Sequence, residues 1–209
     1  MKTLAILGAG ELGQQLAYYA LNDNHYDKVV FFDDYANDKF INGLAILGKI
    51  SALKESFVAK QFDELIIGIG YKHLDVRKKL YDLYAKDIPF GKIIHSTSWV
   101  DSSSIIENGT VVYPGCVIDA KAVVKANTIV NIACTVAHDT EIGKHCFLSP
   151  RVAIAGFVKI QECCFLGINA TIVDTINIAQ NTHLGGGTVV IKSIEKSGLY
   201  VGNPAKFIR

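Results

Sequence analysis

A histidine followed directly by an aspartate, His138-Asp139, is the pair in this sequence best suited to acid–base chemistry. Imidazole has an unperturbed pKa near 6.5, so it can accept a proton at neutral pH. A neighbouring carboxylate can orient the ring and stabilise the imidazolium that forms. The same pair also fits a solvated histidine before a turn, because aspartate tolerates tight corners. The role of the pair therefore depends on the element that holds it.

A second candidate group is the glycine-rich run Gly8-Ala-Gly-Glu-Leu-Gly13, which follows a short apolar run. A GxGxxG motif lets the backbone approach a phosphate at a helix N-terminus, although a tight strand-to-helix turn also needs glycine. Asp33 and Asp34 follow the next apolar run, about 20 residues beyond the loop, where such folds place an acid near a ribose or base. This arrangement favours a nucleotide site.

A repeat of six residues in the sequence predicts the element that positions His138. Every sixth residue from Val100 to Val190 is aliphatic, and the fifth place of each hexad holds a small or β-branched residue. The fourth place often holds Gly, Asn or Asp, which tolerate positive φ. This period is neither helical nor a two-residue alternation. It predicts a parallel β-helix of about five coils, with three hexads per coil and a corner in each hexad. His138 occupies a third place, so its ring should point outward near a corner.

Residues 1–94 have a different pattern, in which apolar strands alternate with helices. Strands are expected near residues 4–7, 29–32 and 65–70, and the helix after the last of these should bury Val76, Leu80 and Leu83. This pattern predicts a small open α/β sheet. A complete dinucleotide domain usually has more strands, so a mononucleotide or nucleotide-sugar fits better than NAD. The predicted domains are 1–94 and 95–209.

Composition excludes several functional classes. The chain has 209 residues, half of them hydrophobic, and a formal net charge of +1 with mixed signs, so no basic face for nucleic acid is expected. No apolar stretch approaches the roughly 20 residues of a membrane span, and the N-terminus does not read as a signal peptide. The five cysteines are expected to pack in the core, without a disulfide, because most occupy fifth places. A cytoplasmic protein is expected. The cysteines are Cys116, Cys134, Cys146, Cys163 and Cys164.

The combination of the two halves resembles the bacterial nucleotide-sugar N-acetyltransferases that are related to the sialic-acid O-acetyltransferases. The resemblance spans the whole chain and implies a small Rossmann-like domain followed by a left-handed parallel β-helix of hexapeptide repeats. The motifs that carry it are the glycine loop, Phe32-Asp33-Asp34, Ile69-Gly70, Ile94-His95, Ala137-His138-Asp139 with Ile142-Gly143, Leu166-Gly167-Ile168-Asn169, Leu184-Gly185-Gly186-Gly187 and Val201-Gly202-Asn203-Pro204-Ala205-Lys206.

The resemblance also implies roles for individual residues. In that family the small domain binds the nucleotide of an amino-sugar, and acetyl-CoA lies along the β-helix between the subunits of a homotrimer. His138 then corresponds to the general base, paired with Asp139, and Gly156 presents its amide to the acetyl group. Ile168 and Gly186 correspond to positions that line the pantetheine arm. The implied substrate-binding residues are Ala9, Gly10, Glu11, Asp33, Asp34, Gly70, Tyr71 and Lys72.

The chain departs from the family pattern in two places. Leu12 stands where many members have a histidine, and Tyr71-Lys72 stands where many have Asn-Asn. Lys72 or Arg77 would supply the phosphate contact instead.

The expected function is acetyl-CoA-dependent N-acetylation of a UDP-, dTDP- or GDP-linked amino-sugar, most simply a 4-amino-4,6-dideoxyhexose for surface glycan synthesis. O-acetylation of a sialic acid or related sugar is the alternative enzyme, and a non-catalytic nucleotide-sugar sensor is the binding alternative. A γ-class carbonic anhydrase needs two zinc histidines five apart plus a third. His138 and His145 are seven apart, so no metal is expected.

Overall fold

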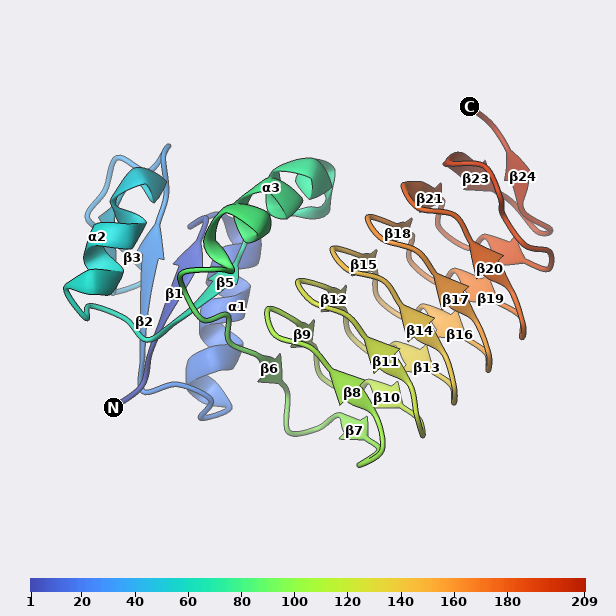
Figure 1. The fold of residues 1–209 in the computed structure, drawn as a ribbon, viewed down its shortest axis with the longest axis horizontal. Helices are drawn as coiled ribbons and strands as arrows, with labels where there is room; N and C mark the ends of the chain where they lie inside the picture. Colours follow the sequence, from blue (N-terminus) through green and yellow to red (C-terminus); the bar gives the residue numbers. More distant parts are fainter. The chain divides into compact units, whose positions relative to one another are not determined.

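The computed structural model describes all 209 residues, and the chain divides into two compact units, Met1–Ile93 and Ile94–Arg209. The first unit is a small α/β sheet with helices, and the second is a parallel β-helix (Figure 1). The predicted fold class, a small Rossmann-like domain followed by a left-handed parallel β-helix, is confirmed. No helix in the structure has the length and apolar character needed to cross a bilayer.

The sheet of the first unit has the strand order β3-β4-β2-β1-β5. The β3/β4 pair is antiparallel and the other pairs are parallel. All five residues of β1 are buried because it pairs on both sides. The strands are β1 (Thr3–Leu7), β2 (Lys28–Phe32), β3 (Phe40–Ile41), β4 (Leu44–Gly48) and β5 (Glu64–Ile67), and the helices are α1 (Glu11–Asn22), η1 (Ile50–Ala52), α2 (Leu53–Val58), η2 (Tyr71–His73) and α3 (Leu74–Tyr84).

The β3–β4 hairpin was not predicted from the sequence. Its two-residue turn is Asn42-Gly43, and both residues have positive φ, 49° and 77°. Asn-Gly is the strongest short-range hairpin signal, because tight hairpin turns need positive φ at both central positions. The Asn42 amide also donates to Gln14 Oε1 at 2.8 Å, which ties the turn to α1.

The buried face of α3 differs from the predicted one. Leu74, Arg77 and Tyr84 are buried, whereas Leu83 is 55% exposed. The Arg77 guanidinium donates to the backbone carbonyls of Ile67 and Ile69, both at 2.8 Å. This charged side chain faces inward because it satisfies carbonyls at the end of β5, and apolar periodicity gives no sign of that arrangement.

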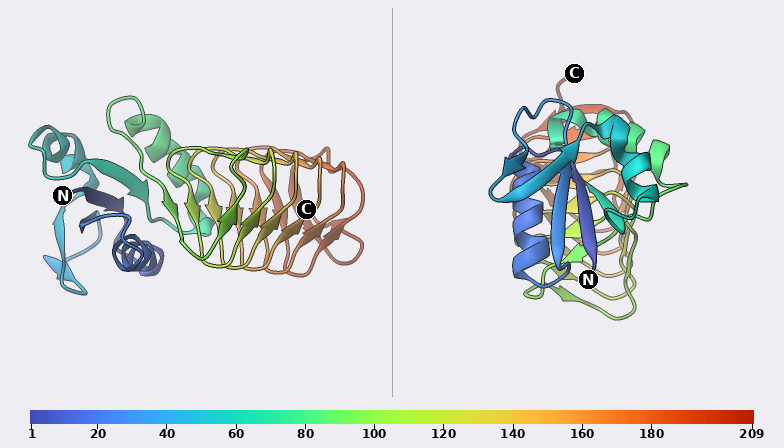
Figure 2. Two further views of the ribbon diagram at one scale, coloured as in Figure 1. Left: turned by 90° about the horizontal axis from the view of Figure 1, so that it is seen from below. Right: turned by 90° about the vertical axis from the view of Figure 1, so that its left-hand side faces the viewer.

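The second unit is built from three sheets whose strands stack from coil to coil (Figures 1 and 2). The first sheet contains β7 (Trp99–Val100), β10 (Val117–Ile118), β13 (Thr135–Val136), β16 (Ala153–Ile154), β19 (Thr171–Ile172) and β22 (Val189–Val190). The second contains β8 (Ile105–Ile106), β11 (Val123–Val124), β14 (Glu141–Ile142), β17 (Lys159–Ile160) and β20 (Asn177–Ile178). The third contains β6 (Ile93–Ile94), β9 (Val111–Val112), β12 (Ile129–Val130), β15 (Phe147–Leu148), β18 (Phe165–Leu166), β21 (Thr182–Leu184), β23 (Gly198–Val201) and β24 (Lys206–Phe207).

Each coil closes through corners in the left-handed region of backbone space. The fourth place of all fourteen hexads from Gly109 to Gly187 has positive φ, between 55° and 80°. Glycine or asparagine adopts this conformation readily, but Lys121, Arg151 and Phe157 are held there too, at some conformational cost. The corner is therefore imposed by the coil, and the residue type follows it only in part.

Neighbouring coils stack with a register of 18 residues, as in the pairing of Val117 with Thr135. The inward aliphatic residues form one continuous core along the coils. Most fifth-place hydroxyls and thiols donate to a backbone carbonyl 15 residues ahead. Examples are Thr128 to Gly143 at 3.0 Å and Cys116 to Asn131 at 3.0 Å. A small residue with a polar atom therefore packs inward and satisfies a second-place carbonyl of the next coil. All five cysteines are buried, and none forms a disulfide.

A substitution at Gly143 tests how closely the backbones of successive coils are stacked. A Cβ at this position would lie 2.6 Å from the carbonyl carbon of Gln161 in the next coil. Gly143→Ala should therefore lower the free energy of unfolding by about 1–3 kcal/mol, because backbone must move to admit the methyl group. Urea denaturation measures this change.

The matched control is Gly115→Asn, because a Cβ at Gly115 meets nothing within 4 Å and asparagine occupies the same corner place elsewhere. Its unfolding free energy should change by less than about 0.5 kcal/mol. Equal effects of the two substitutions would show that coil spacing does not limit the residue at Gly143.

Candidate functional site

The glycine loop lies between β1 and α1, at the carboxyl end of the sheet. Gly8 has φ of 98°, and its N–H donates to the Phe32 carbonyl at 2.8 Å. A Cβ at Gly13 would lie 1.9 Å from the Gly8 oxygen. The backbone conformation and close packing of the loop therefore require these two glycines, whether or not a ligand binds. A Cβ at Gly10 would meet nothing within 4 Å, and α1 begins directly after it. Gly10 is the glycine of the motif that leaves room for a ligand.

Asp33 joins the end of β2 to this loop. Its Oδ2 accepts a hydrogen bond from the Ala9 N–H at 2.7 Å. Its Oδ1 accepts from the N–H groups of Tyr35 and Ala36, at 2.7 and 3.1 Å. Both carboxylate oxygens therefore hold backbone in place. Asp34 is more loosely bound, since its one hydrogen bond is from the Ile50 N–H to Oδ1, at 2.9 Å.

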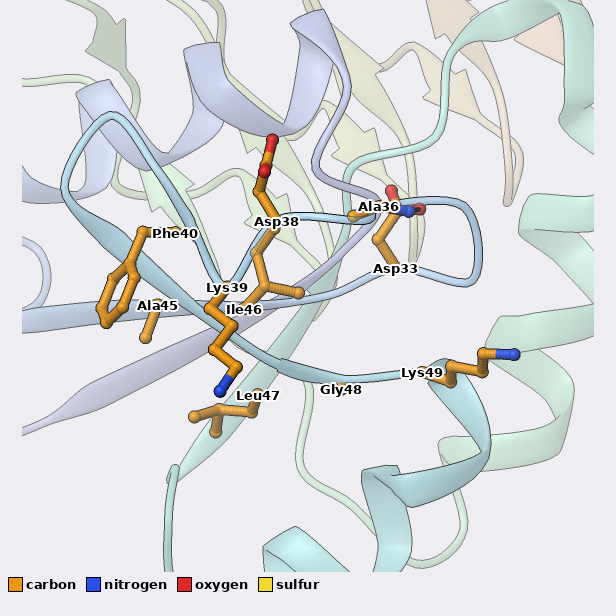
Figure 3. Close-up of a pocket in the computed structure, with 10 residues that line it drawn as sticks. All are labelled: Asp33, Ala36, Asp38, Lys39, Phe40, Ala45, Ile46, Leu47, Gly48 and Lys49. Carbon is orange, nitrogen blue, oxygen red and sulfur yellow. Dashed lines mark hydrogen bonds between the residues drawn. The ribbon is translucent and has the colours of Figure 1, made fainter.

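A pocket of about 500 Å³ lies between Asp33 and the β3–β4 hairpin (Figure 3). A second pocket, of about 290 Å³, shares five lining residues with it and extends to the glycine loop. Figure 3 shows the Asp38 and Lys39 side chains pointing in different directions. The first pocket is lined by Asp33, Ala36, Asp38, Lys39, Phe40, Ala45, Ile46, Leu47, Gly48 and Lys49, and the second by Ala9, Gly10, Asp33, Tyr35, Ala36, Asn37, Asp38, Phe40, Ile41 and Ile46.

The structure brings three of the predicted substrate-binding residues, Ala9, Gly10 and Asp33, into this pair of pockets. The hairpin residues that form much of the lining were not predicted, and the Asn42-Gly43 turn was the signal that could have found them. Glu11, Asp34, Gly70, Tyr71 and Lys72 do not line either pocket.

Gly70, Tyr71 and Lys72 follow the carboxyl end of β5, which neighbours β1 in the sheet. A Cβ at Gly70 would be in open space, and Tyr71 is 43% exposed. Of the two residues expected to meet a phosphate, Lys72 is exposed and Arg77 is buried against backbone carbonyls. The geometry therefore favours Lys72 over Arg77 as a phosphate contact.

The second group of predicted residues occupies one corner of the β-helix, which we call the His138 corner: residues 138, 139, 156 and 157. His138 Nδ1 lies 3.1 Å from Asp139 Oδ2. The carboxylate therefore favours the tautomer in which Nδ1 carries the proton, and Nε2 keeps its lone pair. The His138 side chain is 48% exposed.

Gly156 lies one coil beyond His138, and its lack of a side chain makes room for the imidazole. A Cβ there would lie 2.8 Å from His138 Cε1 and 2.9 Å from Nε2. Gly156 does not have positive φ, so it is not required by the corner itself. Its N–H makes no hydrogen bond within the chain. The position therefore provides both space for the ring and an available amide donor beside it.

Ile168 and Gly186 occupy a different corner, after the third sheet. A Cβ at Gly186 would lie 3.2 Å from Ile168 Cγ2, so these residues also stack from one coil to the next. Ile168 is 50% exposed. One strand of the first sheet separates this corner from the His138 corner, about 6 residues or roughly 20 Å of extended chain. Within one chain, the two sets therefore lie at opposite edges of the first sheet.

The remaining corner histidine, His145, is buried and has a hydrogen bond between Nδ1 and Asn127 Nδ2, 3.0 Å long. No group of three or more His, Cys, Asp or Glu residues is arranged to hold a metal ion.

Comparisons place both halves of the chain among known folds. Residues 3–84 match the family described as the PglD N-terminal domain. The acetyltransferase domain of PglB from Neisseria gonorrhoeae is 29% identical, with a TM-score of 0.92 and 100% of both chains covered. In complex with acetyl coenzyme A, that domain matches with a TM-score of 0.91, 29% identity and 99% of both chains covered.

PerB from Caulobacter crescentus, solved in complex with CoA and GDP-perosamine, is 26% identical to the chain. Its TM-score is 0.91, and the match covers 100% of this chain and 98% of that one. No curated protein matches the sequence.

The hydrogen bonds of the two aspartates predict different effects on stability. Asp33→Ala leaves the Ala9, Tyr35 and Ala36 N–H groups without their acceptor and should lower the free energy of unfolding by about 1.5–3 kcal/mol. Asp34→Ala removes a single exposed bond and should cost under about 1 kcal/mol. Chemical denaturation compares them, and an Asp34 variant as unstable as the Asp33 variant would contradict this assignment.

Proposed function

We propose that the chain transfers acetyl from acetyl-CoA to the amine of a nucleotide-linked sugar, because residues 3–84 match the PglD N-terminal domain and the whole chain has the fold of the solved acetyltransferases. The observation that carries the proposal is the His138 corner, where an imidazole oriented by Asp139 lies beside a side-chain-free position with an available N–H. The solved acetyltransferases that match the whole chain support it.

Acetyl transfer to an amine requires one group to remove a proton and another to stabilise an oxyanion. We infer that the amine nitrogen attacks the thioester carbonyl carbon while His138 Nε2 accepts the proton that the nitrogen loses. The Gly156 N–H donates to the developing oxyanion. The C–S bond then breaks, and the CoA thiolate takes a proton. Asp139 stabilises the imidazolium in between, and no nucleophilic side chain is needed.

The first unit is the proposed nucleotide site. Gly10 and Glu11 at the start of α1 offer backbone N–H groups and the positive end of the helix dipole to a phosphate, and Ala9 lines the same pocket while Asp33 holds its N–H. Lys72 adds a positive charge beside the neighbouring strand end, next to Gly70 and Tyr71. Asp34 keeps one carboxylate oxygen without a partner and is the better candidate than Asp33 for a ribose hydroxyl or a base N–H.

The second unit is the proposed acetyl-CoA site and the proposed trimer interface. Ile168 and Gly186 would line the pantetheine arm, although they lie at the far edge of the first sheet from His138 in the same chain. A homotrimer in which the His138 corner of one subunit meets the Ile168 corner of the next would bring the two sets together. This assembly fits a β-helix with flat, partly apolar outer faces. We further propose a cytoplasmic role in polysaccharide biosynthesis.

Replacing the proposed base tests the mechanism. His138→Ala should lower kcat by about 10²–10⁴-fold with little change in either KM, because general-base catalysis acts on the chemical step. A thiol-release assay over UDP-, dTDP- and GDP-linked 4-amino-sugars measures this.

Asp34→Ala is the matched control. It should raise the KM for the sugar nucleotide by about 10-fold or more and leave the acetyl-CoA KM unchanged.

Sedimentation of the parent and the two variants tests the assembly. A folded His138→Ala protein with kcat within about threefold of the parent would remove His138 as the base. A fully active monomer would contradict the trimer.

A further inference from the structure

Phe157 is an unusual residue for its place in the β-helix. It occupies the left-handed corner position with φ of 57°, where a large side chain is disfavoured, and it is 55% exposed. The residues one coil before and one coil after it at the same corner, Asp139 and Thr175, are polar. Strained backbone conformations cluster at functional sites, so the surroundings of the Phe157 ring are relevant.

The ring of Phe157 lies beside the proposed base. Its centroid is 5.1 Å from that of the His138 imidazole, with an interplanar angle of 86°, an edge-to-face arrangement. Asp139 contacts the imidazole at Nδ1, and the Gly156 backbone lies against Nε2 and Cε1. Phe157 therefore forms an apolar side-chain wall beside the imidazole.

A sugar amine that gives its proton to His138 must lie about 2.6–3.2 Å from Nε2. The substituent on one of the two carbons that flank the amine-bearing carbon can then contact the Phe157 ring. A methyl group or a bare carbon gains from contact with this wall. A hydroxyl against it loses water without gaining a hydrogen bond.

We propose that Phe157 is a specificity-determining residue that selects amino-sugars with an apolar substituent next to the reacting amine. The inference rests on the proposed N-acetyltransferase function and adds the residue that distinguishes between acceptor sugars. The preference belongs to the chain that carries His138, because the base and the wall are on successive coils of one β-helix.

The test compares two acceptors that differ in one hydroxyl, a nucleotide-linked 4-amino-4,6-dideoxyhexose and the corresponding 4-amino-4-deoxyhexose. The parent kcat/KM should favour the 6-deoxy sugar by about 10- to 100-fold, the range that an apolar pocket achieves against an added hydroxyl. Phe157→Asn should reduce this ratio at least fivefold. Phe157→Leu should preserve it, because leucine keeps an apolar surface.

Phe157→Asn should fold normally, because asparagine occupies the same corner place at Asn127, Asn169 and Asn181. Its melting temperature should equal or exceed that of the parent. The matched control, Ala133→Asn, changes another exposed corner residue with φ of 55° and should leave the ratio unaltered.

Two results would overturn the inference. If Phe157→Asn lowers kcat equally for both acceptors and keeps the ratio, the ring only holds His138 in place. If the parent releases no thiol with any nucleotide-linked amino-sugar, the proposed function fails and the inference fails with it. An altered ratio in Phe157→Asn, with normal melting and no change in Ala133→Asn, supports the assignment.

Discussion

The stacking register of 18 residues is the constraint on which the second unit depends. Each coil must close through corners of positive φ, so a residue at one corner always meets the residue 18 positions further along. The proposed functional residues are therefore neighbours in successive coils. His138 lies against Gly156, and Ile168 lies against Gly186. A side chain in one coil determines how much space the next coil must leave. Glycines outside the turn positions therefore lie next to the proposed catalytic and cofactor-binding residues.

Much of the second unit could be predicted from the sequence, because period six, inward aliphatic residues and corner glycines all express one local rule. The limit of that rule is visible at Phe157 and Arg151, which sit at corners that the pattern associates with Gly, Asn or Asp. Repetition of the coil imposes the corner on any residue type. The role of Gly156 could not be separated from a turn on sequence alone, because its space is defined by the ring of His138.

The first unit was less predictable, because its functional groups are fixed by contacts distant in sequence. The glycine motif alone left packing and phosphate binding equally open. The structure assigns Gly8 and Gly13 to packing and leaves Gly10 available. Asp33 was expected to meet a nucleotide, yet both its oxygens accept backbone N–H groups. The hairpin at Asn42 was predictable from its turn chemistry, whereas the inward direction of Arg77 was not.

The central claim is that the imidazole of His138, seated against Gly156, performs the chemistry. Gly156→Ala adds one methyl group that must collide with that ring and leaves every proposed hydrogen-bonding group in place. The account predicts a folded protein whose kcat falls about 10²-fold, because a displacement of about 1 Å has that cost in a positioned site. In the His138→Ala background the same methyl group should have no further effect, since the two positions act as one unit. A Gly156→Ala protein with kcat within about threefold of the parent would contradict the account.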